Sequence, residues 1–286
     1  MPGKTMEPAR HLAAHAQGQF ICEAWTGTVL TVHARAVNIL RADGLVVSLV
    51  ADMDSMTGLG VCVPGLFEEP PEAAAVGREV VRDGQWIEVA EFARLDLSKS
   101  RMWKSTIDDA LIREVPAARI AQVRDALLLY GKTGGLLGIL SPERATNPFV
   151  EKARKALVDR RLEALVGLGP GLTPAGDDFL VGALMAFPCK PRGELLRAAW
   201  PWTTPAGRTL LWMALRRSFP AYLVALADCI VCSNSPEAIS EAVRVACAHG
   251  ETSGSDALAG FCWARLNLNR TRLRPDAVRC RLKAWQ

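Results

Sequence analysis

Residues 165–187 combine glycines, prolines and carboxylates in a pattern typical of a ligand-binding turn that opens a helix. Glycines at every second position over 167–171 exclude a helix there, and Thr173-Pro174 then offers an N-cap and a first helical residue. The residues that follow are apolar almost all round, which predicts a buried helix. Backbone N–H groups at such a helix N-terminus suit phosphate or carboxylate. A capped turn with no ligand is the alternative interpretation.

A second segment repeats this arrangement further along the chain. Residues 176–182 have the form G-x-D-x-x-x-G, and residues 254–260 have the same form. Each follows a threonine dipeptide and runs into an apolar helix, which indicates either a chance recurrence or a pseudo-repeat that points two helix N-termini at one pocket. We favour the pseudo-repeat. The expected anion-binding residues in these segments are Gly169, Gly171, Thr173, Gly176, Thr252, Ser253 and Gly254.

Three carboxylates accompany the glycines, and they are the candidate catalytic residues: Asp177, Asp178 and Asp256. If all were ionised and close together, they would repel an anionic substrate. They could face away and only cap the helices, or they could hold a cation such as Mg²⁺ that bridges to phosphate oxygens. One of them could also be a general base with a raised pKa. The sequence leaves these three roles open.

Helical periodicity dominates the chain after residue 105. Apolar spacing, proline N-termini and glycine stops predict helices over 107–115, 117–130, 147–165, 206–217, 220–232 and 236–249. The segment 266–274 is polar and ambiguous. Gly131-Lys132-Thr133 is not a P-loop, because position 126 holds alanine inside a predicted helix. We expect it to be a helix C-terminus with a glycine-rich turn through Gly134 and Gly135.

Short β-rich runs separated by tight turns fill residues 20–100. Strands are expected over 27–33, 37–40, 45–50, 59–63, 78–82 and 85–92, with Asp43-Gly44 and Asp83-Gly84 as hairpin turns. The sequence therefore predicts an α+β protein. Residues 1–105 would form an antiparallel β-sheet or small barrel, and residues 106–286 a helical domain that carries the glycine turns.

Composition narrows the class of protein. Half of the 286 residues are apolar and 22% are charged, which indicates a folded core and excludes disorder as the main feature. Seven basic side chains against one acid in 265–283 predict a partner-facing tail, and the lack of interleaved aromatic residues disfavours nucleic acid. With no apolar leader or membrane span and eight cysteines expected as reduced thiols, we expect a cytoplasmic protein with no membrane association.

The stretch GLGPGLTPAGDDFLVGAL at residues 167–184 resembles the signature of a bacterial family long classed as a domain of unknown function. That family contains AllH, a subunit of oxamate carbamoyltransferase. Residues 36–38, 45–49 and 250–260 also look like the family's pattern, so Asn38 joins the candidate substrate-binding residues. Glu251 departs from the pattern, because the family usually has histidine there.

The resemblance implies a carbamoyltransferase subunit in a hetero-oligomer of allantoin and purine catabolism. The implied ligands are carbamoyl phosphate, phosphate, and oxamate or a related small amide, with Mg²⁺ as the one cofactor considered. Both substrates are small anions, which agrees with two glycine turns at helix N-termini. A non-catalytic binding or scaffolding subunit is the alternative. A stand-alone phosphoryl-transfer enzyme is disfavoured by the missing P-loop.

Overall fold

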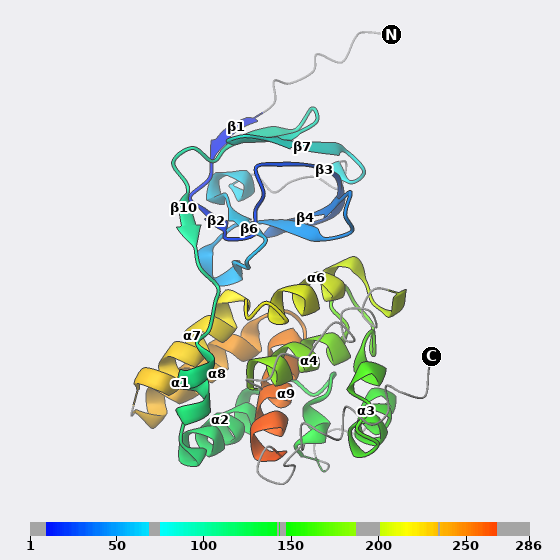
Figure 1. The fold of residues 1–286 in the computed structure, drawn as a ribbon, viewed down its shortest axis with the longest axis vertical. Coiled ribbons are helices and arrows are strands. Elements are labelled where there is room, and N and C mark those ends of the chain that lie inside the picture. The colour runs from blue at the N-terminus through cyan, green and yellow to red at the C-terminus, as the bar shows by residue number, and fades with distance from the viewer. Residues whose placement is uncertain are drawn as a thin grey trace, which may run out of the picture.

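The computed structural model describes residues 10–68, 75–141, 143, 147–186, 201–233 and 235–267. Strands occupy the N-terminal part and helices the C-terminal part, and the two lie one above the other in Figure 1. The last strand ends at Trp103 and the first helix begins at Asp109. This confirms the α+β class, with strands first and helices second.

Ten strands form one curled sheet in the order β1-β9-β8-β7-β3-β4-β5-β6-β2-β10. Their bounds are β1 (Arg10–Ala13), β2 (Ala16–Gly18), β3 (Ala24–His33), β4 (Ala36–Arg41), β5 (Val46–Val50), β6 (Gly60–Cys62), β7 (Glu79–Asp83), β8 (Trp86–Val89), β9 (Ala93–Asp96) and β10 (Arg101–Trp103).

The sheet is mixed, which corrects the expected antiparallel arrangement. Pairs β1–β9, β5–β6 and β2–β10 are parallel, and the other six pairings are antiparallel. The two predicted hairpins are antiparallel as expected, with Gly44 and Gly84 at positive φ in their turns. Pairs β1–β9 and β2–β10 join strands far apart in the sequence, whereas β5 and β6 are consecutive and still run parallel. Apolar alternation along one strand carries no information about the direction of its partner.

The inner face of the curled sheet holds its own apolar core. Val29, Ile39, Val61 and Ile87 are among its buried members. Met213, from the helical part, packs into the same cluster, so the two parts of the chain share buried contacts. The Ser105 hydroxyl also hydrogen-bonds the Ser218 hydroxyl where the chain passes from strands to helices.

Eight α-helices occupy the described C-terminal part. They are α1 (Asp109–Glu114), α2 (Ala117–Tyr130), α3 (Pro148–Val158), α4 (Ala175–Ala186), α6 (Pro205–Ala214), α7 (Ala221–Cys232), α8 (Pro236–Ala248) and α9 (Ser253–Asn267).

Most of the helices agree with the predicted ranges, and the exception has a local cause. The predicted helix 147–165 stops at Val158, where Arg160 takes a positive φ of 57°, and a 3-10 turn follows over Leu162–Leu165. Of the ambiguous segment, residues 266 and 267 end α9 and the remainder lies outside the described residues.

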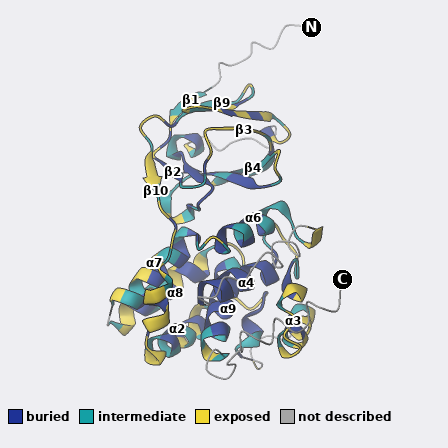
Figure 2. Cartoon of the chain, viewed as in Figure 1, coloured by how far each residue is buried: buried dark blue, intermediate teal, exposed yellow. Residues whose placement is uncertain are grey.

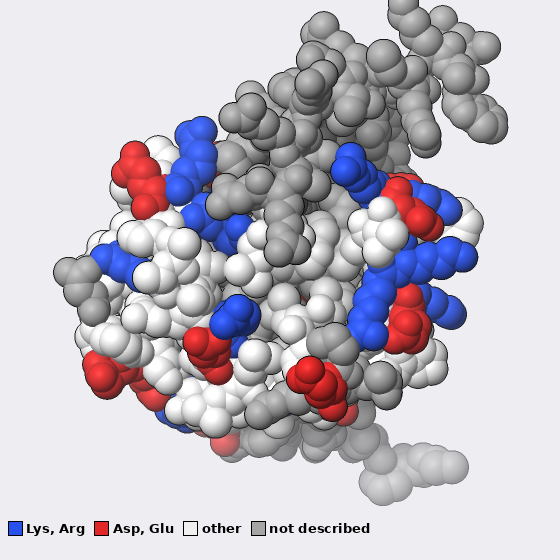
Figure 3. Space-filling model, turned by 90° about the horizontal axis from the view of Figure 1, so that it is seen from below, with Lys and Arg blue, Asp and Glu red and all other residues white. Residues whose placement is uncertain are grey.

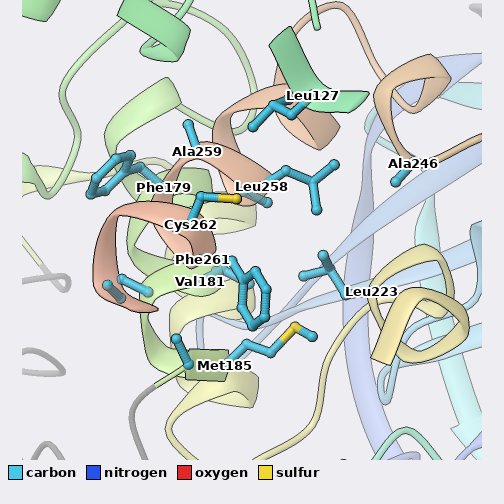
Figure 4. Packing of buried hydrophobic residues seen from close by; sticks show 14 of the residues in the cluster. Leu127, Phe179, Val181, Met185, Leu223, Ala246, Leu258, Ala259, Phe261 and Cys262 are labelled. Carbon is cyan, nitrogen blue, oxygen red and sulfur yellow. The ribbon is translucent and has the colours of Figure 1, made fainter. Parts of the chain in front are cut away.

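α4 lies at the centre of the helical part and packs along α9. Every residue of α4 is buried, as its lack of a polar face predicts, and α4 and α9 are dark throughout much of their length in Figure 2. Phe179 and Val181 of α4 and Leu258 and Phe261 of α9 share one core cluster, whose packing is drawn in Figure 4. In the described part of the chain, no helix is long and apolar enough to cross a membrane.

Candidate functional site

The two glycine motifs pack against each other in a reciprocal way. A β-carbon at Gly182 would lie 1.6 Å from the carbonyl oxygen of Ala257, and one at Gly260 would lie 1.8 Å from that of Phe179. Phe179 and Ala257 each follow the aspartate of their motif. The last glycine of each motif therefore contacts the residue after the aspartate of the other motif. This backbone contact between α4 and α9 fixes their N-termini side by side.

The loop before α4 depends on glycine for its conformation. Gly167, Gly169 and Gly171 have positive φ values of 72°, 111° and 100°, which side chains with a β-carbon rarely adopt. The helix begins at Ala175, and the Thr173 hydroxyl hydrogen-bonds the Ser253 hydroxyl at 2.9 Å. Thr173, predicted as a helix cap, therefore links the two turns.

Another turn, residues 131–136, lies against the start of α9. Lys132 donates its backbone N–H to the Ser255 hydroxyl at 2.9 Å and its ammonium group to the Gly250 carbonyl at 2.7 Å. The Leu136 N–H donates to Asp256 Oδ1 at 2.5 Å. We call residues 131–136, 167–174 and 250–256 the three-turn site. In chain order they are its first, second and third turns.

Sequence reasoning identified the second and third turns and missed the first as part of the site. It correctly gave Gly131 as a helix end, since α2 stops at Tyr130 and the Gly131 N–H bonds the Leu127 carbonyl. The signal that could have found it is the combination of three glycines with a lysine in one turn. Lys132 is exposed and brings the one side-chain cation among these three segments.

Asp177 lies at the start of α4 and stabilises the second turn, which precedes it. The carboxylate is fully buried, accepts the Gly167 N–H at 2.9 Å and accepts the Thr203 hydroxyl. Burial raises the pKa of Asp177 to about 6, and these two hydrogen bonds act in the opposite direction. Both of its oxygens are thus used within the fold.

Asp178 lies between the second turn and the third. The side chain is 1% exposed, and Oδ2 has no hydrogen-bond partner among the described residues. Burial raises the pKa of Asp178 well above its ordinary value, hydrogen bonding from Ser253 and Thr173 lowers it, and the Asp256 charge raises it. A neutral Asp178 removes the repulsion that an anion would otherwise meet.

Asp256 joins the first turn to the third. It is fully buried, and its Oδ2 also has no partner within the described part of the chain. Burial raises the pKa of Asp256 to about 7, whereas hydrogen bonds from Leu136 and Thr252 lower it. A β-carbon at Gly135 would lie 2.2 Å from Asp256 Oδ1, so this carboxyl also requires glycine in the first turn.

Tyr222 of α7 lies beside the two central carboxyls. Burial, and then the charges of Asp178 and Asp256, raise the pKa of Tyr222 well above its ordinary value. The His249 ring stacks on Tyr222 with centroids 4.4 Å apart, just before the third turn. These two aromatic groups were not predicted, because α7 and α8 give no motif that marks them.

The sheet contributes charged groups near His249. Burial lowers the pKa of His249, while Asp52 raises it and Lys132 lowers it, so both charges lie close to the imidazole. Asp52 follows β5 and is paired with Arg35. The strand part of the chain therefore reaches the edge of the three-turn site through Asp52.

Asn38 lies elsewhere on the sheet. It donates to the Thr31 hydroxyl at 2.9 Å and accepts from the Ser48 hydroxyl at 2.8 Å, and these bonds stay within β3, β4 and β5. Among the described residues, no hydrogen bond links the Asn38 side chain to the three-turn site. The Mg²⁺ expectation has no cluster to support it either, since the described side chains bring no three His, Cys, Asp or Glu together.

On the face in Figure 3, acidic and basic side chains are interspersed among uncharged ones. The basic segment 268–286, proposed above as partner-facing, lies outside the described residues. The hydrogen-bond donors that the described part of the three-turn site offers are backbone N–H groups, hydroxyls and the Lys132 ammonium.

The described residues thus form a helical unit that presents paired glycine turns beside buried carboxyls. Residues 165–265 match the model of the family described as oxamate carbamoyltransferase subunit AllH. The match spans about a third of the chain and contains the second and third turns and both G-x-D-x-x-x-G motifs. It confirms the resemblance to the AllH family over this segment. No curated protein and no solved structure matches the chain.

Proposed function

We propose that this chain is a subunit of an oxamate carbamoyltransferase-like enzyme and that it binds small anionic substrates at the three-turn site. One observation carries the proposal: the segment that matches the AllH family holds two turns that the fold brings together through Thr173 and Ser253. A purely structural role would not require the exposed loop before α4. Gly171 and Leu172 are exposed there, and Gly171 needs its positive φ.

The reaction that we assign transfers a carbamoyl group from carbamoyl phosphate to the amide nitrogen of oxamate. The nitrogen attacks the carbamoyl carbon, the bond from that carbon to the phosphate oxygen breaks, and the products are oxalurate and phosphate. Such a transfer needs positioning and stabilisation of negative charge more than a protein nucleophile. Catabolism runs the same reaction in reverse.

We assign each residue of the site a role in substrate binding or catalysis according to its surroundings. Backbone N–H groups of 169–175 and the Lys132 ammonium bind phosphate oxygens, and the hydroxyls of Thr173, Thr252 and Ser253 add donors. Asp178 orients these hydroxyls from beneath, and its neutral carboxyl gives its proton to the departing phosphate and takes the proton that the attacking amide loses. Asp177 holds the second turn in shape, and Asp256 holds the first.

Other subunits complete the enzyme in this proposal. Trp202 is 72% exposed and lines a hollow of about 490 Å³ together with Gly167 and Leu168 of the second turn. Exposed aromatic residues beside a site are common where protein interfaces form. We therefore expect a partner subunit to cover this side of the second turn.

Calorimetry on the isolated chain tests the proposal directly. Carbamoyl phosphate, phosphate and oxamate are each titrated into the chain, and saturable binding of at least one is expected. The chain is then mixed with its partner subunits, and oxalurate formation is measured with and without it. Stable co-assembly without anion binding, and with activity unchanged by three-turn variants, would favour the scaffolding role instead.

A further inference from the structure

A second hollow lies on the curled sheet, where β3 begins and where β4 and β7 end. Its volume is about 590 Å³, within the range of small-molecule sites. It shares no residue with the three-turn site. Its lining residues come from three strands and the hairpin after β4: Ala24, Trp25, Thr26, Arg41, Ala42, Asp43, Val81, Arg82 and Asp83.

Strand register places two arginines where the fold elsewhere has apolar side chains. Trp25 pairs with Arg82 across β3 and β7, and Gly27, two residues further, pairs with Arg41 across β3 and β4. Alternation along the strands puts these side chains on the same face as Val29, which is the inner apolar face. Gly27 adds no side chain between them.

The side chains that line this hollow include buried hydrogen-bond donors that have no acceptor among the described residues. Arg82 is only 5% exposed, and its Nε and Nη1 have no hydrogen-bond partner among the described residues. The same holds for Arg41 Nε and for Trp25 Nε1. Asp43 holds the other end of Arg41 through Nη2 at 2.6 Å. Buried polar groups are nearly always paired, so these donors together require an acceptor.

We infer that this hollow, which we name the arginine hollow, binds a small organic anion whose carboxylate or phosphate oxygens accept from Arg82, Arg41 and Trp25. Every unpaired group is a donor, and two of the three side chains carry a fixed positive charge. The Trp25 ring, on the same face as the two arginines, offers an apolar surface for the rest of the molecule. Asp43 is paired with Arg41 and offsets part of its charge, whereas Asp83 is exposed to solvent that screens it, so Arg82 supplies the unpaired positive charge.

Thermal unfolding of the full chain with benzoate, phenyl phosphate, inorganic phosphate and the neutral isostere benzamide tests this inference. We expect saturable stabilisation by benzoate or phenyl phosphate and none by benzamide. A response to inorganic phosphate alone would identify a phosphate site without an organic part. No saturable response to any of the three anions would overturn the inference.

Variants then locate the binding. Arg82→Gln should weaken it at least tenfold, whereas Arg101→Gln, on exposed β10, makes the same charge change and should leave it unaltered. If Arg82→Gln does not fold, Arg41→Gln replaces it, because Arg41 is less buried. Lys132→Ala must retain the binding, which separates this hollow from the three-turn site. Equal binding by both arginine-hollow variants and wild type would overturn the inference.

Discussion

Gly182 of α4 lies so close to Ala257 of α9 that a β-carbon would be placed 1.6 Å from the Ala257 carbonyl oxygen. The two helices are thus in direct backbone contact at this point, and the opposite contact of Gly260 with Phe179 is almost as close. Since the aspartates lie one turn before these glycines, the contact also sets how near Asp178 and Asp256 come to each other. Packing of the core and geometry of the site are therefore fixed by the same residues.

Replacing Gly182 with alanine should destabilise the protein strongly. The added methyl group would meet the backbone of α9, so neither helix can move away without displacing the turns. We expect a loss on the order of 3 kcal/mol in the free energy of unfolding. Urea denaturation measures it. Gly65→Ala is the matched control, because its β-carbon would meet only a Leu12 side-chain carbon at 3.3 Å. Similar losses in the two variants would contradict the helix contact described here.

Lys132 should contribute to anion affinity without contributing to the fold. Its ammonium group is exposed and bonded to the Gly250 carbonyl, at the edge of the third turn. We expect Lys132→Ala to weaken phosphate binding roughly tenfold, the size typical of one charge-assisted hydrogen bond, with little change in the unfolding midpoint. Titration calorimetry measures the affinity. Lys152→Ala, on exposed α3, should bind phosphate as wild type does, and an equal effect of both would point to bulk charge.

Asp178 should be sensitive to the shape of its replacement. Asn keeps an oxygen that accepts hydrogen bonds from the hydroxyls of Thr173 and Ser253. Ala leaves both hydroxyls without this acceptor and creates a small cavity. We expect Asp178→Ala to lower anion affinity at least tenfold and Asp178→Asn to retain most of it while turnover of the assembled enzyme falls. Unchanged affinity and unchanged turnover in Asp178→Ala would remove this residue from the proposed mechanism.

The parts of the fold that sequence could predict are those set by local rules. Pro148, Pro205 and Pro236 each begin a helix, behind caps at Asn147, Thr204 and Ser235. The buried nature of α4 followed from its unbroken apolar surface. The parallel pairs of the sheet could not be predicted, because β1 and β9 meet only after the whole sheet has curled.

The candidate site shows the same division. The glycine motifs marked the second and third turns, but the first turn reaches them through long-range contacts such as Lys132 with Ser255. The adjacent aspartates looked equivalent in the sequence, yet Asp177 bonds Gly167 and Thr203 while Asp178 adjoins Thr173 and Ser253. Neighbouring positions on a helix point about 100° apart, so burial on all sides gives each a different environment.

Asp256 should make the protein less stable as pH rises. Its pKa is raised from 3.8 to about 7 in the folded chain, chiefly by burial, so the folded state holds this proton where the unfolded state has lost it. Stability must then fall as pH increases from about 4 to about 7, with the full penalty present above that range. Asp177, with a pKa near 6, acts in the same direction.

Asp256→Asn should flatten this dependence, because the amide cannot ionise and its oxygen can still accept the Leu136 N–H. Urea denaturation at about pH 5 and about pH 8 gives the free energy of unfolding at both ends of the range, and the variant should lose less between them than wild type does. Asp125→Asn serves as control, since Asp125 is an exposed carboxylate of α2 and should leave the slope intact. An unaltered slope in Asp256→Asn would show that Asp256 does not hold its proton in the folded state.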